Sequence, residues 1–211
     1  MTQSTILSTA YFAPVQWFQK LNRSVHCYIE CHDHYVKQTY RNRCIIATTN
    51  GPQALTIPIE RPEGRRADKT PMRDIRISDH GAWRHLHWNA LQSAYGESPF
   101  FEFYADDLRP FFEKRWEFLI DFNTEITYKM CELLDIQPHI ELTTHYEPIP
   151  QEEALAHQDY RDIIRPKHPG DDPTFTPERY YQVYQQKWGF IPNLSILDLL
   201  FNEGNESVFY L

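Results

Sequence analysis

The stretch TILSTAYFAPVQWFQKLNRSVHCYIEC, residues 5–31, predicts the fold because it reads as strand, helix and strand within about 30 residues. Residues 5–12 form an apolar, β-prone run, and Pro14 suits the start of a short amphipathic helix over residues 15–25. Residues 26–31 then return to a strand pattern. We therefore expect an α/β fold with a mixed sheet that begins with a βαβ-like unit.

A β-hairpin is expected directly after this unit. Two β-rich runs flank Asn50-Gly51 in YRNRCIIATTNGPQALTIPIE, and Asn-Gly readily adopts the positive φ angles of a hairpin turn. Shorter strands are expected at residues 74–78 and 140–146. Residues 148–177 are rich in proline, acidic residues and histidine without apolar periodicity, which predicts a loop.

Helices are expected mainly in the middle and C-terminal part of the chain. Apolar residues recur at helical spacing over residues 82–95 and again over residues 106–136, with a break predicted near residues 121–124. A last helix is predicted over residues 194–202. No internal repeat interrupts this order, so we expect one domain spanning residues 1–211.

Composition excludes several functional classes. The net charge of −8 argues against a general surface for nucleic acid or anionic membranes, so any anion site must be local. No apolar run approaches the roughly 20 residues that span a bilayer. The four cysteines form no CxxC pair, and the chain opens without a secretory signal pattern, which predicts a cytoplasmic location with reduced thiols.

The segment HDHYVKQTYRNRC, residues 32–44, is the main candidate for function. If residues 35–46 are extended, alternate side chains share a face, and one face then carries a ladder of cations while the other carries amides. These residues are Lys37, Arg41 and Arg43 on the first face and Gln38 and Asn42 on the second. The cations require either carboxylates supplied by the fold or an anionic ligand, and spacing alone favours the two equally.

Other chemistry-bearing residues have structural explanations that are at least as good. His32 and His34 alternate onto one strand face and could bind a metal ion, but no third ligand can be located. Cys44 is a conceivable acyl acceptor, although a buried cysteine is usually inert. Ser195, three residues before Asp198, matches a helix capping box better than a nucleophile motif. Nucleotide-binding glycine loops are absent.

Several long segments together resemble the WbqC-like protein family. They occur in the family's order over nearly the whole chain, which makes the resemblance more specific than any short motif. The segments are AYFAPVQWF, HDHYVKQTYRNRC, LTIPI, KTPMRDIRI, HWNALQSAYGESPFFEFYADDLRPFFEKRWEFL and GFIPNLSILDLLFNEG. The family pattern carries an acidic pair where this chain has Cys31 and His32, so any role that requires those acids is in doubt.

The resemblance implies a bacterial protein of surface-polysaccharide biosynthesis, with glycyl or aminoacyl transfer to an amino sugar or sugar nucleotide as the associated activity. Charge layout and resemblance together predict an anion-binding cleft at the strand ends, with acid–base and oxyanion groups beside it. The predicted catalytic residues are His34, His87, Gln38 and Asn42, and the predicted substrate-binding residues are Tyr11, Lys37, Arg41, Arg43, Lys69 and Tyr95. The sequence assigns no cofactor, metal or oligomeric state.

Two other classes of function stay open from the sequence. A non-catalytic binding or scaffolding protein of a polysaccharide assembly would use the same cations to dock an acidic partner. A metal-dependent hydrolase would use His32, His34 and a distant carboxylate.

Overall fold

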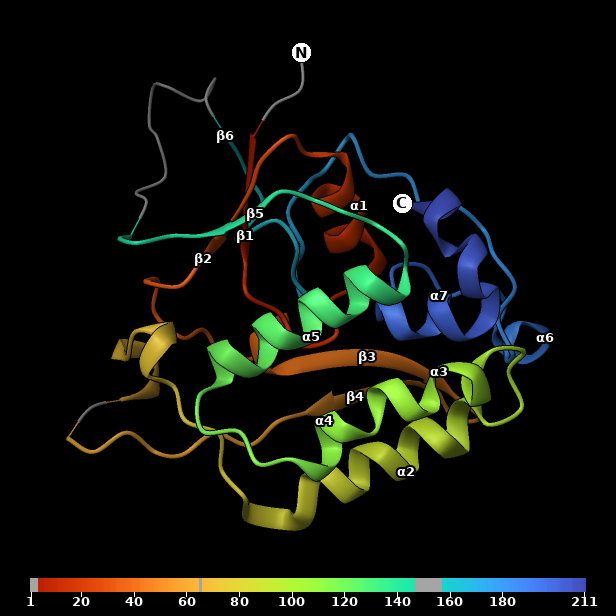
Figure 1. Ribbon diagram of the computed structural model, residues 1–211, viewed down its shortest axis with the longest axis horizontal. Coiled ribbons are helices and arrows are strands. Elements are labelled where there is room, and N and C mark those ends of the chain that lie inside the picture. The colour runs from red at the N-terminus through yellow and green to blue at the C-terminus, as the bar shows by residue number, and fades with distance from the viewer. Residues whose placement is uncertain (1–3, 65, 147–156) are drawn as a thin grey trace.

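The computed structural model describes residues 4–64, 66–146 and 157–211, and it has the expected α/β architecture (Figure 1). The strands are β1 (Ser4–Ser8), β2 (Cys27–Glu30), β3 (Arg43–Thr48), β4 (Gly51–Thr56), β5 (Ile140–Leu142) and β6 (His157–Asp159). The α-helices are α1 (Val15–Arg23), α2 (Trp83–Tyr95), α3 (Phe101–Leu108), α4 (Pro110–Glu113), α5 (Leu119–Leu133), α6 (Gln185–Trp188) and α7 (Ile196–Glu203). The 3-10 helices are η1 (Tyr40–Asn42), η2 (Ala67–Lys69), η3 (Met72–Asp74), η4 (His80–Ala82) and η5 (Gly204–Tyr210). None of the described helices is both long enough and apolar enough to cross a bilayer.

The predicted βαβ unit is confirmed and forms the centre of a four-stranded parallel sheet. Its strand order is β5-β2-β1-β6, and Thr5 of β1 lies opposite Cys27 of β2. Helix α1 packs on β1, and the Trp17 indole donates a hydrogen bond to the Ser8 carbonyl at 2.9 Å. The chain adds β2 and β5 on one side of β1 and β6 on the other, so the carboxyl ends of β1 and β6 mark the point where the strand order reverses. Ligands of open α/β sheets commonly bind at such a point.

The predicted hairpin is confirmed as well. Strands β3 and β4 pair antiparallel from Arg43 opposite Thr56 to Thr48 opposite Gly51, and Gly51 has the positive φ of 98° that the turn requires. This pair forms a sheet of its own beside the parallel one. Helix α5 lies between the two sheets (Figure 1), where the Asn123 amide donates hydrogen bonds to the Thr9 hydroxyl after β1 and the Arg41 carbonyl before β3.

The helical region contains a break in a different place from the predicted one. Helix α4 ends at Glu113 and α5 begins at Leu119, so residues 121–124 are helical and residues 114–118 are not. Backbone hydrogen bonds explain the position: Ile77 donates to the Glu117 carbonyl, and Leu119 donates to the Ile75 carbonyl. Pairing with the segment around Ile77 needs extended backbone, so no helix can run through residues 117 and 118. The strand predicted at residues 74–78 accordingly occurs only as isolated bridges.

The C-terminal helix begins where the capping pattern placed it. The Ser195 hydroxyl accepts a hydrogen bond from the Leu197 amide, as an N-cap does. Asp198 does not complete a capping box, because its two carboxylate oxygens bind side chains in the core instead.

Residues 35–46 are not one extended strand, which corrects the assumption behind the predicted ladder of cations. Gln38 has a positive φ of 60°, and residues 40–42 form the 3-10 helix η1. The Tyr40 carbonyl accepts from the Tyr11 amide at 2.9 Å, and this contact with the end of β1 bends the chain away from a strand path. Alternation of faces therefore begins only at Arg43.

Part of the predicted loop at residues 148–177 packs against the parallel sheet and α1, which its composition does not suggest. Residues 148–156 lie outside the described residues, but β6 follows and completes the parallel sheet. Further along, Asp172 is anchored on α1 by a buried ion pair with Lys20 at 2.8 Å and a hydrogen bond from Gln16. The described part of this segment is thus fixed against the sheet and α1.

Candidate functional site

A pocket of about 480 Å³ lies at the carboxyl edge of the parallel sheet. It is built from the segments that leave β2, β5 and β6, and these segments meet because parallel strands end at a common edge. The lining residues are His32, Asp33, His34, Val36, Arg41, Tyr146, Arg161 and Asp162. The charged residues among them are two arginines and two aspartates, so the pocket is balanced in charge rather than cationic.

The floor of this pocket is a buried ion network centred on Arg161. Its guanidinium donates to Glu30 at 2.8 Å and makes a bidentate contact with Asp159, with Nη2 at 2.6 Å from Oδ2. Glu30, the last residue of β2, has no exposed surface. The bidentate Arg161–Asp159 pair and the Glu30 contact join the ends of β6 and β2 across β1, which fixes the geometry of the pocket.

Asp33 and Arg41 form a second ion pair on the wall. The Asp33 Oδ2 atom accepts from the Arg41 guanidinium, whereas Asp33 Oδ1 is shielded from solvent and has no hydrogen-bond partner among the described residues. The Arg41 Nε atom is likewise unpartnered there. Burial raises the pKa of the Asp33 carboxyl, and the neighbouring Arg41 opposes that shift only in part. The Oδ1 atom is therefore a hydrogen-bond acceptor without a donor in the described part of the chain.

His32 and His34 differ in their surroundings. The His32 Nε2 atom lies 3.0 Å from the Thr143 carbonyl oxygen, and the His32 Nδ1 atom faces the Arg73 guanidinium. A nearby cation disfavours a metal ion at Nδ1, so this contact argues against the metal site considered from the sequence at His32 and His34. His34 is exposed at the mouth of the pocket, and its backbone pairs with Pro71.

Residues 61–76 carry six Lys or Arg residues and are called the basic loop below. This loop lies alongside residues 32–44, but its described cations do not line the pocket at the carboxyl edge. Backbone bonds from Tyr35 to Thr70 and from Met72 to Asp33 hold the two segments together. Lys37 lines a separate pocket of about 380 Å³ that also contains Arg61 and Arg66. Arg66 is paired with Asp68, while Lys37 and Arg61 have no ion pair among the described residues.

The remaining predicted residues of the 32–44 segment and the basic loop are placed elsewhere. The Arg43 guanidinium donates to the Thr56 hydroxyl across the hairpin, and the Asn42 amide donates to the Ile57 carbonyl. Gln38 and Lys69 are exposed and line none of the pockets described above. Of the predicted residues, the pocket at the carboxyl edge brings together only His34 and Arg41.

Tyr11 and His87 contact each other in the core. The Tyr11 hydroxyl and the His87 Nδ1 atom lie 3.0 Å apart, and both side chains are buried. Burial lowers the pKa of His87 to about 4, which keeps the imidazole neutral at physiological pH. Their placement is typical of a satisfied polar pair in a core.

Tyr95 is buried against Asp198. Its hydroxyl donates to Asp198 Oδ1 at 2.8 Å, and Tyr180 and Gln182 donate to Oδ2 at 2.8 and 3.0 Å. Burial raises the pKa of this carboxyl to about 6, against the opposing effect of its three donors. Every oxygen of Asp198 is satisfied by the protein itself.

Cys44 is fully buried in β3, and burial raises the pKa of its thiol well above the ordinary value. The other three cysteines are also buried and free of disulfides. A thiol that stays protonated is a poor nucleophile, so Cys44 does not behave as an activated acyl acceptor.

Sequence reasoning missed Arg161, Glu30 and Tyr146. Arg161 lies in a stretch whose composition predicted a loop, and Glu30 ends a strand where an acidic residue looks solvent-facing. The signal that could have found Arg161 is the short apolar cluster around it, since the neighbouring Tyr160 and Ile164 are buried.

Comparison with known proteins agrees with the resemblance noted in the sequence. The model of the WbqC-like protein family matches residues 9–166 and 167–210. The chain belongs to the WbqC-like protein family. It is also 31% identical over 196 residues to the uncharacterized protein Rv1507c of Mycobacterium tuberculosis (strain ATCC 25618 / H37Rv), with 84% of this chain and 83% of that protein covered. No solved structure matches the chain.

Proposed function

We propose that this WbqC-like protein transfers a glycyl or other aminoacyl group to the amine of an amino sugar phosphate or sugar nucleotide in surface-polysaccharide biosynthesis. The observation that carries the proposal is the pairing of Asp33, a residue that lines the pocket. One of its carboxylate oxygens accepts a hydrogen bond from Arg41, and the other has no partner among the described residues. A buried carboxylate oxygen without a protein partner is costly in a folded protein unless a ligand or a water molecule donates to it. An ammonium group is the ligand donor that suits it best.

The proposed reaction uses Asp33 as the base. The acceptor enters as an ammonium ion, and one proton passes from its nitrogen to Asp33 Oδ1. The free amine then attacks the acyl carbonyl carbon, so that a C–N bond forms and the bond to the leaving group breaks. The second proton given up by the nitrogen departs with the leaving group, and Asp33 returns its own proton to water. The raised pKa of Asp33 brings its proton affinity closer to that needed for general-base catalysis.

Two other features are given roles in this proposal. In this proposal His34, an exposed residue that lines the pocket, relays the proton from Asp33 to solvent. The phosphate of the acceptor is assigned to Lys37 and Arg61, because Val36 lines the first pocket and the adjacent Lys37 lines the second. The sugar would thus lie at the sheet edge with its anionic group toward the basic loop.

Titration calorimetry with glucosamine 1-phosphate and with N-acetylglucosamine 1-phosphate tests the amine site. The wild-type protein should bind the free amine at least about tenfold more tightly than the acetamide, because a charge-assisted hydrogen bond to Asp33 contributes roughly 1.5–3 kcal/mol. Asp33→Asn should remove the preference, while Asp106→Asn, which changes an exposed carboxylate, should keep it. Equal affinity of the wild type for the two ligands would overturn the assignment.

The phosphate assignment is tested separately with two ligands. Lys37→Ala should weaken glucosamine 1-phosphate by several-fold and leave glucosamine unchanged, since only the first carries the anion. An equal loss for both ligands would mean that Lys37 affects the pocket rather than the phosphate.

A second candidate function, non-catalytic binding of the same ligands, is favoured by one observation. Among the residues that the structure describes, the lining of this pocket includes no cysteine, serine or threonine that could carry an acyl group. Mass spectrometry of the protein incubated with glucosamine 1-phosphate and a glycyl thioester distinguishes the two functions. A glycylated sugar supports transfer, whereas saturable binding without product supports the binding protein.

A further inference from the structure

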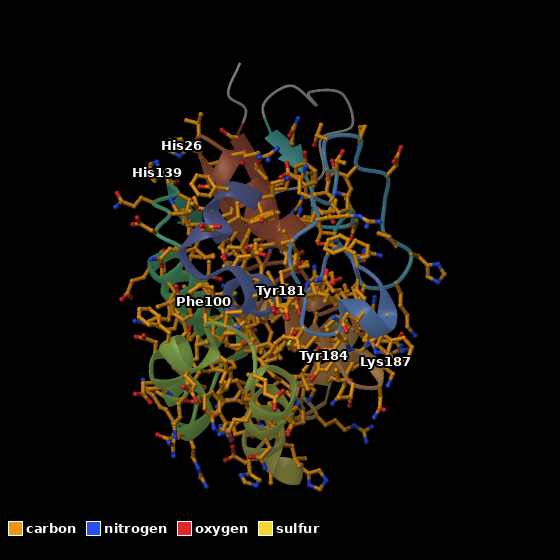
Figure 2. All side chains as sticks on the ribbon, turned by 90° about the vertical axis from the view of Figure 1, so that its right-hand side faces the viewer. His26, Phe100, His139, Tyr181, Tyr184 and Lys187 are labelled. Carbon is orange, nitrogen blue, oxygen red and sulfur yellow. The ribbon has the colours of Figure 1, made fainter. Side chains whose placement is uncertain are left out.

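The amino-terminal edge of the parallel sheet, opposite the pocket, carries a cluster of two imidazoles and one carboxylate. His26 directly precedes β2, His139 directly precedes β5, and Glu141 is the second residue of β5. Figure 2 shows the labelled His26 and His139 next to each other on this edge. Their candidate ligand atoms all lie within 4.8 Å of one another.

The strand register places these three side chains together. Cys27 lies opposite Ile140 in the parallel pair, so the preceding residues His26 and His139 are neighbours across the two strands. The Cys27 amide donates to the His139 carbonyl at 2.9 Å, which fixes this register next to the cluster. Glu141 lies two residues after His139, and alternation along a strand brings its side chain to the same face.

The distances fit a tetrahedral metal ion. Glu141 Oε1 lies 3.5 Å from His26 Nδ1 and 3.7 Å from His139 Nε2. Ligands bound to zinc at about 2.0–2.1 Å in tetrahedral geometry lie roughly 3.3–3.4 Å apart, so small side-chain rotations suffice. The two imidazole rings are 3.9 Å apart between centroids.

The His26 ring has an atom without a hydrogen-bond partner. Its Nδ1 is shielded from solvent and forms no hydrogen bond within the part of the chain that the structure describes, although the Glu141 carboxylate faces it. A neutral imidazole nitrogen that faces a carboxylate and a second imidazole is a typical metal ligand.

We propose that His26, His139 and Glu141 bind a zinc-class divalent cation, with a fourth coordination position open to water. The side chains of His139 and Glu141 are 59% and 47% exposed, which leaves solvent access to that position. The ion ties the edge strand β5 to β2 through side chains, in addition to their backbone ladder. The site is distinct from the pocket, since β5 carries it at one end and leads to Thr143 and Tyr146 at the other.

Zinc alone, added to protein freed of metal with a chelator, tests this site by titration calorimetry. The wild type should bind one Zn²⁺ per chain, and His139→Ala and Glu141→Gln should each weaken binding by at least about tenfold. His85→Ala removes an exposed histidine outside the cluster and should leave binding unchanged. Absence of saturable binding, or binding that persists in His139→Ala and in Glu141→Gln, would overturn the proposal.

Two further readouts separate a specific site from surface histidine binding. Co²⁺ in this site should give the intense visible absorption of a tetrahedral ion, which His139→Ala should abolish. Zn²⁺ should raise the melting temperature of the wild type and not that of His139→Ala, because an ion that binds only the folded state stabilises it. An octahedral Co²⁺ spectrum, or an equal Zn²⁺ shift in both proteins, would contradict the site.

Discussion

Two carboxylates, the buried Asp198 on α7 and the largely buried Asp33 just after β2, show how differently one fold can use the same chemical group. Both have a raised pKa because of burial. Asp198 receives three hydrogen bonds from Tyr95, Tyr180 and Gln182 and lines none of the pockets described here. Asp33 accepts a hydrogen bond from Arg41 on one oxygen, and its other oxygen has no partner among the described residues. The first carboxylate has donors for both of its oxygens, whereas the second leaves one oxygen for the ligand that we propose.

The largest effect in this comparison is expected when the ion network beneath Asp33 is broken. Arg161→Met should lower the free energy of unfolding by about 3–5 kcal/mol, because it leaves the buried Glu30 and Asp159 without their arginine. Urea unfolding measures the loss. Arg165→Met, which removes a partly exposed arginine paired with the exposed Asp162, should cost less than about 1 kcal/mol. Similar losses in both variants would mean that the network does not define the pocket floor.

Removal of Asp198 should have the next largest effect. Asp198→Ala deprives the Tyr95, Tyr180 and Gln182 donors of their acceptor and should lower the free energy of unfolding by about 3 kcal/mol. The same urea experiment checks this value. Asp171→Ala, an exposed acidic position, is the matched control and should change stability little. A neutral Asp198→Ala would show that this carboxylate is not a structural anchor.

Asp198 and His87 should contribute to the pH dependence of stability with opposite signs. The folded-state pKa of His87 is about 4, below the usual 6.5, so its contribution to stability is complete above pH 6.5 and is lost as the pH falls toward 4. The folded-state pKa of Asp198 is about 6, above the usual 3.8, so its contribution is complete at low pH and is lost as the pH rises toward 6. The two slopes oppose each other between pH 4 and 6.

The pH dependence of the free energy of unfolding that one group causes can be measured in a variant that lacks the other group. Between pH 4 and 6, the stability of His87→Gln should fall as the pH rises, and that of Asp198→Asn should rise. The difference between a folded-state pKa of about 4 for His87 and the usual 6.5 corresponds to a change in the free energy of unfolding on the order of 3 kcal/mol. Urea midpoints measured at several pH values test this, and parallel curves for the two variants would contradict the assignment.

The local elements could be predicted from the sequence, and the contacts between distant segments could not. The βαβ unit and the Asn50-Gly51 hairpin follow from patterns within about 30 residues, and both are confirmed. The break before Leu119 was misplaced because it depends on pairing with Ile75 and Ile77, some 40 residues earlier. Tertiary pairing there overrides the helical pattern.

The candidate site follows the same division. The segment that contains His34 and Arg41 was singled out by its local charge, and both residues line the pocket at the carboxyl edge. Sequence could not show that Arg161, 131 residues after Glu30, would neutralise that edge. Sequence also could not show that Arg41, predicted as one of several cations on a strand face, would be neutralised by an ion pair with Asp33.

The smallest of the expected losses of stability, and the most direct test of the account, comes from Asp33→Asn. The variant should lower the free energy of unfolding by about 1.5–3 kcal/mol, because the neutral Asn side chain leaves the buried Arg41 guanidinium without its carboxylate. Calorimetric titration of this folded variant with glucosamine 1-phosphate should show affinity about tenfold weaker than that of the wild type. Wild-type affinity in folded Asp33→Asn would contradict the claim that the carboxyl edge of the parallel sheet is the ligand site.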